Sequence, residues 1–151
     1  KLTAPIADWH SWRQSDTAAV GRNYLRFGID PLRPRYDDLS NIQSGKDNLM
    51  GWRMVEFPLY QVLGASVKNI VGVGSIEVWL RLITIISSVS TAMLLGWIVM
   101  TLVDPISGVS VAFVFAVLPY SVYYGRSILP EPFMVFWAVL SLFFAIKMLI
   151  P

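Results

Sequence analysis

A change in the pattern of polar and apolar residues divides the chain near residue 56. Charged and polar residues dominate before this point, and long apolar runs dominate after it. Three of the runs approach the length of about 20 residues that a helix needs to cross a bilayer. They predict membrane-spanning helices at about 76–103, 108–124 and 133–150.

The apolar stretch 57–73 differs from these spans because it is interrupted by Gln61, Lys68 and Asn69. Such a pattern is typical of an interfacial helix beside the first span, with a short span as the alternative. The sequence therefore predicts an all-α integral membrane protein. Its parts are an N-terminal loop with an amphipathic helix, a juxtamembrane helix and three spans, at residues 1–56, 57–73 and 76–151.

A helix within the polar part is predicted at 12–27. Ser11 and Gln14 fit the capping box, in which the first side chain caps the helix and the fourth returns the contact. Gly28 is a typical residue just beyond a helix end. This register places Asp16 in the first turn, where the helix dipole stabilises a carboxylate.

Two arginines of this helix, Arg22 and Arg26, are four residues apart, where like charges repel unless an anion lies between them. A solvated face is the predicted explanation, and a bound anion is the alternative. The following stretch, 28–55, is rich in proline, glycine, aspartate and asparagine. Such residues favour turns, so we expect a structured polar loop there.

The number of times that the chain crosses the membrane decides which turns lie on the same side as the loop. If 57–73 does not cross the membrane, the loop and the turn after the second span lie on the same side. Four charged residues would then emerge on one face of the membrane, namely Asp16, Glu56, Arg126 and Glu131.

The distribution of charge does not decide on which side of the membrane the loop 1–56 lies. Residues 1–56 hold eight of the 12 Lys and Arg, whereas 104–107 hold none, which by the positive-inside rule favours a cytoplasmic loop. The same 56 residues also hold seven of the 10 acids, and the rule has little force for a long folded segment.

Composition supports the membrane interpretation and excludes several kinds of site. With 55% hydrophobic and 15% charged residues, the chain is too apolar for an ordinary globular surface. It has no cysteine and a single histidine, which excludes disulfides, thiolate zinc sites and multi-histidine sites. A net charge of +2 without a basic run argues against nucleic acid as a partner. The abrupt ends lead us to expect a piece of a longer protein.

Two carboxylates are candidates for chemistry. Asp16 has Arg13 one turn before it and is suited to act as a general base, although a helix-favouring Asp without a function is the alternative. Glu131 lies between two prolines at the start of the third span, and acids at such boundaries are functional candidates. Nearby Arg126 is suited to snorkelling toward the interface.

Three stretches, Trp12–Ala18, Glu56–Tyr60 and Gly125–Pro132, carry a resemblance in this order over nearly the whole chain. Together they resemble the N-terminal part of GT-C-fold membrane glycosyltransferases of family 39, the group of protein O-mannosyltransferases and lipid A aminoarabinose transferases. Asp16 stands alone where the mannosyltransferases have two adjacent acids. Glu56-Phe-Pro-Leu stands where the aminoarabinose transferases have Lys-Pro-Pro.

The resemblance implies a partial GT-C fold and inverting transfer of a sugar from a polyprenyl-phosphate donor to a hydroxyl of a lipid, glycan or protein acceptor. Asp16 would be the general base, and Glu131 would help to orient acceptor or sugar. Arginine forks suit the donor phosphate. The residues expected to bind donor or acceptor are Trp12, Arg13, Gln14, Arg53, Glu56 and Arg126.

The same resemblance implies a multi-pass protein of the inner or plasma membrane with loop 1–56 extracytoplasmic, in contact with membrane lipids. It predicts no cofactor and no required metal, although two carboxylates on one face permit a divalent cation. A polytopic transporter and a non-catalytic scaffold are the alternatives. Charges near one interface, rather than at the midplane, favour the transferase. We expect the isolated chain to be inactive, because much of the donor cavity would lie in other helices.

Overall fold

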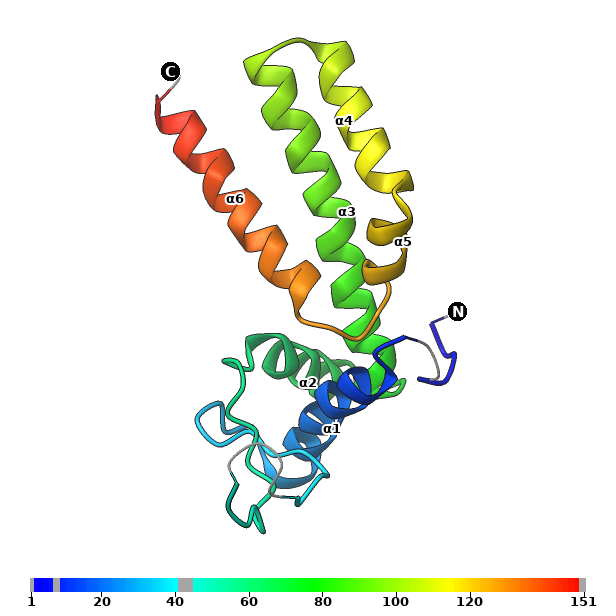
Figure 1. Ribbon diagram of the computed structural model, residues 1–151, viewed down its shortest axis with the longest axis vertical. Coiled ribbons are helices and arrows are strands. Elements are labelled where there is room, and N and C mark those ends of the chain that lie inside the picture. The colour runs from blue at the N-terminus through cyan, green and yellow to red at the C-terminus, as the bar shows by residue number, and fades with distance from the viewer. Residues whose placement is uncertain (1, 7–8, 41–44, 150–151) are drawn as a thin grey trace. The chain divides into compact units, whose positions relative to one another are not determined.

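The computed structural model describes residues 2–6, 9–40 and 45–149. These residues form helices and no β-strand, which confirms the predicted all-α class (Figure 1). The helices are α1 Ser11–Phe27, α2 Leu59–Val71, α3 Ile76–Leu102, α4 Pro105–Val117, α5 Pro119–Tyr124 and α6 Glu131–Leu149. The chain divides into two compact units, Lys1–Leu82 and Ile83–Pro151, and α3 continues from the first into the second.

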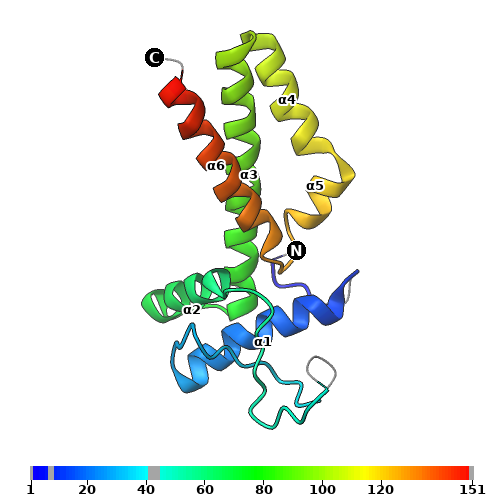
Figure 2. The same cartoon turned by 60° about the vertical axis from the view of Figure 1, so that its left-hand side comes forward.

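The core of the first unit forms where α1 and α2, which lie against each other, meet the first turns of α3 (Figures 1 and 2). Glycines permit this approach. A Cβ at Gly64 of α2 would lie 2.5 Å from Leu80 Cδ2, and one at Gly21 of α1 would lie 2.9 Å from Ile76 Cγ1. The hydroxyl of buried Tyr60 donates a 2.8 Å hydrogen bond to the Leu80 carbonyl. Leu80 is therefore packed between the two helices and bonded to one of them.

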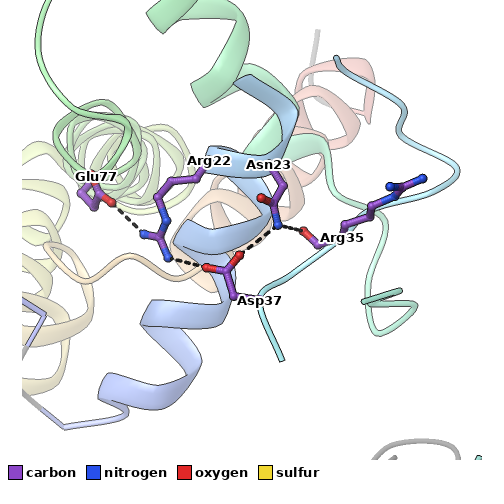
Figure 3. A network of polar contacts seen from close by, with 5 residues as sticks. All are labelled: Arg22, Asn23, Arg35, Asp37 and Glu77. Atoms are coloured by element: carbon purple, nitrogen blue, oxygen red, sulfur yellow. Dashed lines mark hydrogen bonds and ion pairs between the residues drawn. The ribbon is translucent and has the colours of Figure 1, made fainter. Parts of the chain in front are cut away.

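A polar network also holds α1 to α3 and to the loop (Figure 3). Arg22 pairs with Glu77 of α3 at 2.8 Å and with Asp37 of the loop at 3.3 Å. The Asn23 amide donates to Asp37 and to the Arg35 carbonyl. The predicted solvated face is therefore wrong for Arg22, because two carboxylates from other segments converge on its guanidinium. It is confirmed for Arg26, whose side chain is exposed.

The loop that follows α1 is ordered by paired backbone bonds. Arg35 and Trp52 form an isolated β-bridge, and the Arg35 guanidinium lies 4.6 Å from the Trp52 ring centroid. The Tyr36 N–H donates to the Gly51 carbonyl at 2.9 Å. Gly51 has a φ of 63°, and a Cβ there would lie 2.6 Å from the Tyr36 oxygen, so glycine is required at the turn. The structured loop predicted at 28–55 is confirmed at these positions.

The start of α1 differs from the predicted capping box. His10 is the N-cap in the left-handed conformation, with φ 56° and ψ 29°, and no side chain caps the helix. Ser11 is already helical, and the Gln14 amide instead donates to the Trp9 carbonyl at 3.0 Å. The prediction that Asp16 lies in the first turn is wrong, because Asp16 is the sixth residue of α1 and one helical turn has about 3.6 residues. The predicted end is confirmed, since Gly28 follows Phe27 at φ 92°.

In the second unit, α4 returns antiparallel to α3, and α6 runs in the same direction as α3 (Figure 1). Small residues let α3 and α4 approach closely, since a Cβ at Gly108 would lie 2.6 Å from the Gly96 carbonyl oxygen. Asp104 caps α4 by accepting the N–H groups of Ile106 and Ser107. Trp97 of α3 and Phe143 of α6 bring their ring centroids within 5.3 Å.

Within the described residues, two helices are long and apolar enough to cross a membrane, α3 and α6. Only 6% of the apolar window of α6 is buried, so α6 is not the enclosed core helix of a soluble domain. An exposed apolar surface of this size indicates membrane association. α2 has 13 residues and a length of about 20 Å, which is less than the roughly 30 Å of a hydrocarbon core.

The stretch predicted as one span at 108–124 is instead two helices. α4 ends at Val117, and Leu118 adopts φ −57° and ψ 128° before Pro119 begins α5. Proline disfavours the helical conformation of the residue before it and lacks an N–H for the helical ladder. The apolar run is continuous in sequence, but its backbone is broken at this proline.

We expect Gly64→Ala to lower the free energy of unfolding by about 1–2 kcal/mol, because overpacking against Leu80 exceeds the gain in helix propensity. Thermal unfolding of the detergent-solubilised chain, followed by circular dichroism, measures the change. Asn69→Ala, at an exposed position of the same helix, is the matched control. A Gly64→Ala variant as stable as the wild type would contradict the close packing.

Two tyrosines provide a second test of the core. Tyr60→Phe removes a buried hydrogen bond to Leu80 and is expected to cost about 1 kcal/mol. The buried hydroxyl of Tyr24 makes no hydrogen bond within the described part of the chain, so Tyr24→Phe should be neutral or stabilising. The same unfolding measurement compares both variants, and equal losses would argue against the assigned bond.

Candidate functional site

Two crossed ion pairs join α1 to the end of the loop. Arg53 donates to Asp16 with its Nη1 atom 2.9 Å from Oδ2, and Arg13 Nη2 lies 3.6 Å from Glu56 Oε2. Arg13 and Asp16 are one helical turn apart, and Arg53 and Glu56 have the same spacing. Each arginine therefore faces the acid of the other segment. We call these four residues the head site.

Arg53 is held firmly within the head site. Its side chain is only 5% exposed, and its guanidinium lies 5.3 Å from the centroid of the Tyr36 ring. Its backbone N–H donates to the Pro34 carbonyl at 2.9 Å. A buried cation needs a compensating anion, and Asp16 supplies it. The site thus places a buried permanent positive charge beside a carboxylate that is 24% exposed and so remains accessible.

The environment of Asp16 raises the pKa of its carboxyl above the ordinary value of 3.8. Burial is the largest cause, because it disfavours the charged form. Arg53 opposes this shift, and the negative charges of Asp38 and Asp37 add to it. Asp16 therefore holds a proton more tightly than an ordinary aspartate, which makes its carboxylate a better proton acceptor.

One carboxylate oxygen of Glu56 in the head site has an unused capacity to accept a hydrogen bond. Its Oε2 atom pairs with Arg13, whereas its buried Oε1 atom makes no hydrogen bond to the part of the chain that the structure describes. Buried polar atoms are normally satisfied. This oxygen is therefore suited to accept a hydrogen bond from a hydroxyl group of a ligand.

The other two site residues predicted on α1 lie differently. Gln14 is buried, with 4% exposure, and its bond to the Trp9 carbonyl holds the chain that enters the helix. Trp12 is 65% exposed. The structure gives Gln14 a positioning contact and leaves the Trp12 ring on the surface.

The remaining predicted residues, Arg126 and Glu131, belong to the second unit. Arg126 is exposed and follows α5, and Glu131 is the first residue of α6, as its position between two prolines predicts. The head site alone therefore accounts for four of the eight predicted residues as one cluster.

The pairing within the head site is not among the features predicted from the sequence. A signal for it is nevertheless present as a repeated spacing, since Arg13-Gln-Ser-Asp16 and Arg53-Met-Val-Glu56 share the pattern Arg-x-x-acid. Two such segments that lie antiparallel bring opposite charges together at both ends. Tyr36, which carries the ring beneath Arg53, was not predicted and has no comparable signal in the sequence.

No group of three or more histidine, cysteine, aspartate or glutamate side chains that could hold a metal ion occurs among the described residues. Comparisons with protein-family models, with curated proteins and with solved structures find no match to this chain.

A double-mutant cycle is expected to rank the two ion pairs. Asp16→Asn with Arg53→Gln should give a coupling energy of roughly 2 kcal/mol, because Arg53 is buried and the atoms are 2.9 Å apart. Arg13→Gln with Glu56→Gln should give less than about 1 kcal/mol, since this pair is longer and Arg13 is more exposed. Thermal unfolding of the single and double variants provides both values. A larger coupling for the outer pair would contradict the assigned burial.

Proposed function

We propose that this chain belongs to a multi-pass membrane glycosyltransferase of GT-C type. It would transfer a sugar with inversion from a polyprenyl-phosphate donor to an acceptor hydroxyl at the extracytoplasmic face of the membrane. The observation that carries this proposal is the pairing of Asp16 with the buried Arg53. It combines a proton acceptor with a cation suited to phosphate, which are the two groups that the reaction requires.

In the proposed reaction, Asp16 accepts the proton of the acceptor hydroxyl. The acceptor oxygen forms a bond to the anomeric carbon, and the bond from that carbon to the phosphate oxygen breaks. The polyprenyl phosphate leaves with the electron pair, and its charge is stabilised by arginines, for which Arg53 and Arg13 are proposed. No cofactor is required for this displacement.

Arg53 has two competing partners in this scheme. Without a ligand, Arg53 lowers the pKa of Asp16, although the opposite effect of burial is larger. A donor phosphate near Arg53 would compete for its guanidinium and weaken that effect. Donor binding would thereby make Asp16 a stronger base at the moment when the acceptor is to be deprotonated.

The distribution of charge in the apolar helices supports interfacial chemistry over permeation. α3 carries its charges, Glu77 and Arg81, in its first two turns, and α6 carries Glu131 and Lys147 near its two ends. Transporters place their coupling charges near the bilayer midplane. The transport alternative therefore lacks its expected residues in these two helices.

Asp16→Asn in the intact protein is expected to reduce sugar transfer from a polyprenyl-phosphate donor by 100-fold or more, since a general base contributes roughly 10²–10⁴-fold. Asp47→Asn, which removes an exposed carboxylate of the same loop, is the matched control and should keep full activity. Transfer of radiolabelled sugar to the acceptor measures both. Full turnover in Asp16→Asn removes the residue from the role of base.

The pH dependence of transfer is expected to follow the pKa of Asp16. Activity requires the carboxylate, so it should fall as pH decreases, with a midpoint above 3.8 because burial raises the pKa. Arg53→Gln removes a group that lowers this pKa, so the acidic limb should move to higher pH. Initial rates across the pH range test both statements. A shift to lower pH in Arg53→Gln would be inconsistent with the proposed pair.

A further inference from the structure

A groove of about 450 Å³ lies within the second unit, between α3, α4 and α5. Apolar side chains from all three helices line it, among them Val89, Met93, Phe115 and Val122. Small residues keep it open, since Ala92 of α3 and Ala116 of α4 also line it. The break at Leu118 contributes to its shape, because residues on both sides of the break face the same groove.

Polar groups are confined to a few positions of the groove. Arg126, Ser121 and Ser88 are its polar lining side chains, and Gly125 lies against Ser88. A Cβ at position 125 would lie 2.6 Å from Ser88 Oγ, so the glycine brings the chain that carries Arg126 close to α3. Arg126 is exposed, and no ion pair to it occurs within the described residues. One unneutralised cation therefore accompanies an apolar groove.

This combination fits one class of ligand. α3 is long and apolar enough to cross a membrane, so the groove along it lies within reach of lipid chains. An apolar groove alone does not select a lipid in a bilayer, because neighbouring chains are equally apolar. Arg126 supplies the selectivity, since a guanidinium binds phosphate through charge-assisted hydrogen bonds. Ser121 and Ser88 add hydroxyl groups that can donate to phosphate oxygens.

We infer that the groove between α3, α4 and α5 binds a membrane phospholipid, with an acyl chain along Val89, Met93 and Phe115 and the phosphate on Arg126. Phospholipid surrounds any helix that crosses a bilayer, so it is the phosphate-carrying lipid within reach of α3. A polyprenyl phosphate carries the same charged group and is an alternative outcome of the test. The inference does not rest on the proposed glycosyl transfer, because it requires only the groove and its cation.

Native mass spectrometry of the chain released from detergent micelles tests the site. The chain is titrated with phosphatidic acid, with polyprenyl monophosphate and with diacylglycerol, which has apolar chains but no phosphate. We expect the phosphate lipids to bind and diacylglycerol to bind at least tenfold more weakly. Arg126→Gln should weaken phosphatidic acid about tenfold, as expected for loss of a charge-assisted hydrogen bond, and leave diacylglycerol unchanged.

Two matched controls separate the site from general effects of charge and volume. Lys147→Gln removes a cation near the far end of α6 and should leave binding intact. Ala116→Leu fills the groove and should weaken both phosphate lipids, whereas Ala138→Leu adds the same volume at an exposed position of α6 and should not. Circular dichroism confirms that each variant is folded.

The outcomes separate the phospholipid from its alternatives. Phosphatidic acid binding at least as tightly as polyprenyl monophosphate supports the inference, and tighter binding of polyprenyl monophosphate overturns it in favour of a carrier-lipid site. Diacylglycerol binding as tightly as phosphatidic acid, or unchanged binding in both Arg126→Gln and Ala116→Leu, overturns the inference. Unchanged binding in both variants is the result expected if another protein segment covers the groove. Because no sugar transfer is measured, loss of activity in Asp16→Asn has no bearing on this result.

Discussion

The close packing of Leu80 against α1 and α2 is the constraint on which the first unit depends. Gly64 and Gly21 let the two helices approach the first turns of α3 to distances that a side chain would prevent. Tyr60 adds a hydrogen bond to the backbone at the same point. Arg22 then fixes the rotation of α1 by its pairs with Glu77 and Asp37. The direction in which Asp16 points follows from these contacts.

The head site gains its chemical character from this rigid surrounding. A flexible surface pair of arginine and aspartate is screened by water and contributes little to stability. Arg53 is instead enclosed over Tyr36 and tied by its backbone to Pro34, so its charge acts on Asp16 at short range. Burial acts on the same carboxyl in the opposite direction and is the larger effect. Asp16 therefore keeps a raised pKa although a buried arginine lies beside it.

Local features of the chain were predictable, and contacts between distant segments were not. The predicted helix 12–27 and the first and third spans agree with α1, α3 and α6 to within two residues, because apolar periodicity and glycine act locally. The capping box failed because His10 takes a left-handed conformation that no pattern indicates. Pro119 is a signal for a break in the helix, but the continuous apolar run around it favoured the prediction of a single span. Asp16 and Arg53 are 37 residues apart, so only the fold brings them together.

The position of Asp16 within α1 has an electrostatic consequence. Asp16 is the sixth residue of the helix, so its carboxyl lies beyond the first turn, where unpaired amide groups would stabilise a negative charge. A carboxylate in that first turn would be a weaker base, because the helix itself would favour the ionised form. The proton affinity of Asp16 is therefore set by its burial and its charged neighbours, rather than by the end of the helix that carries it.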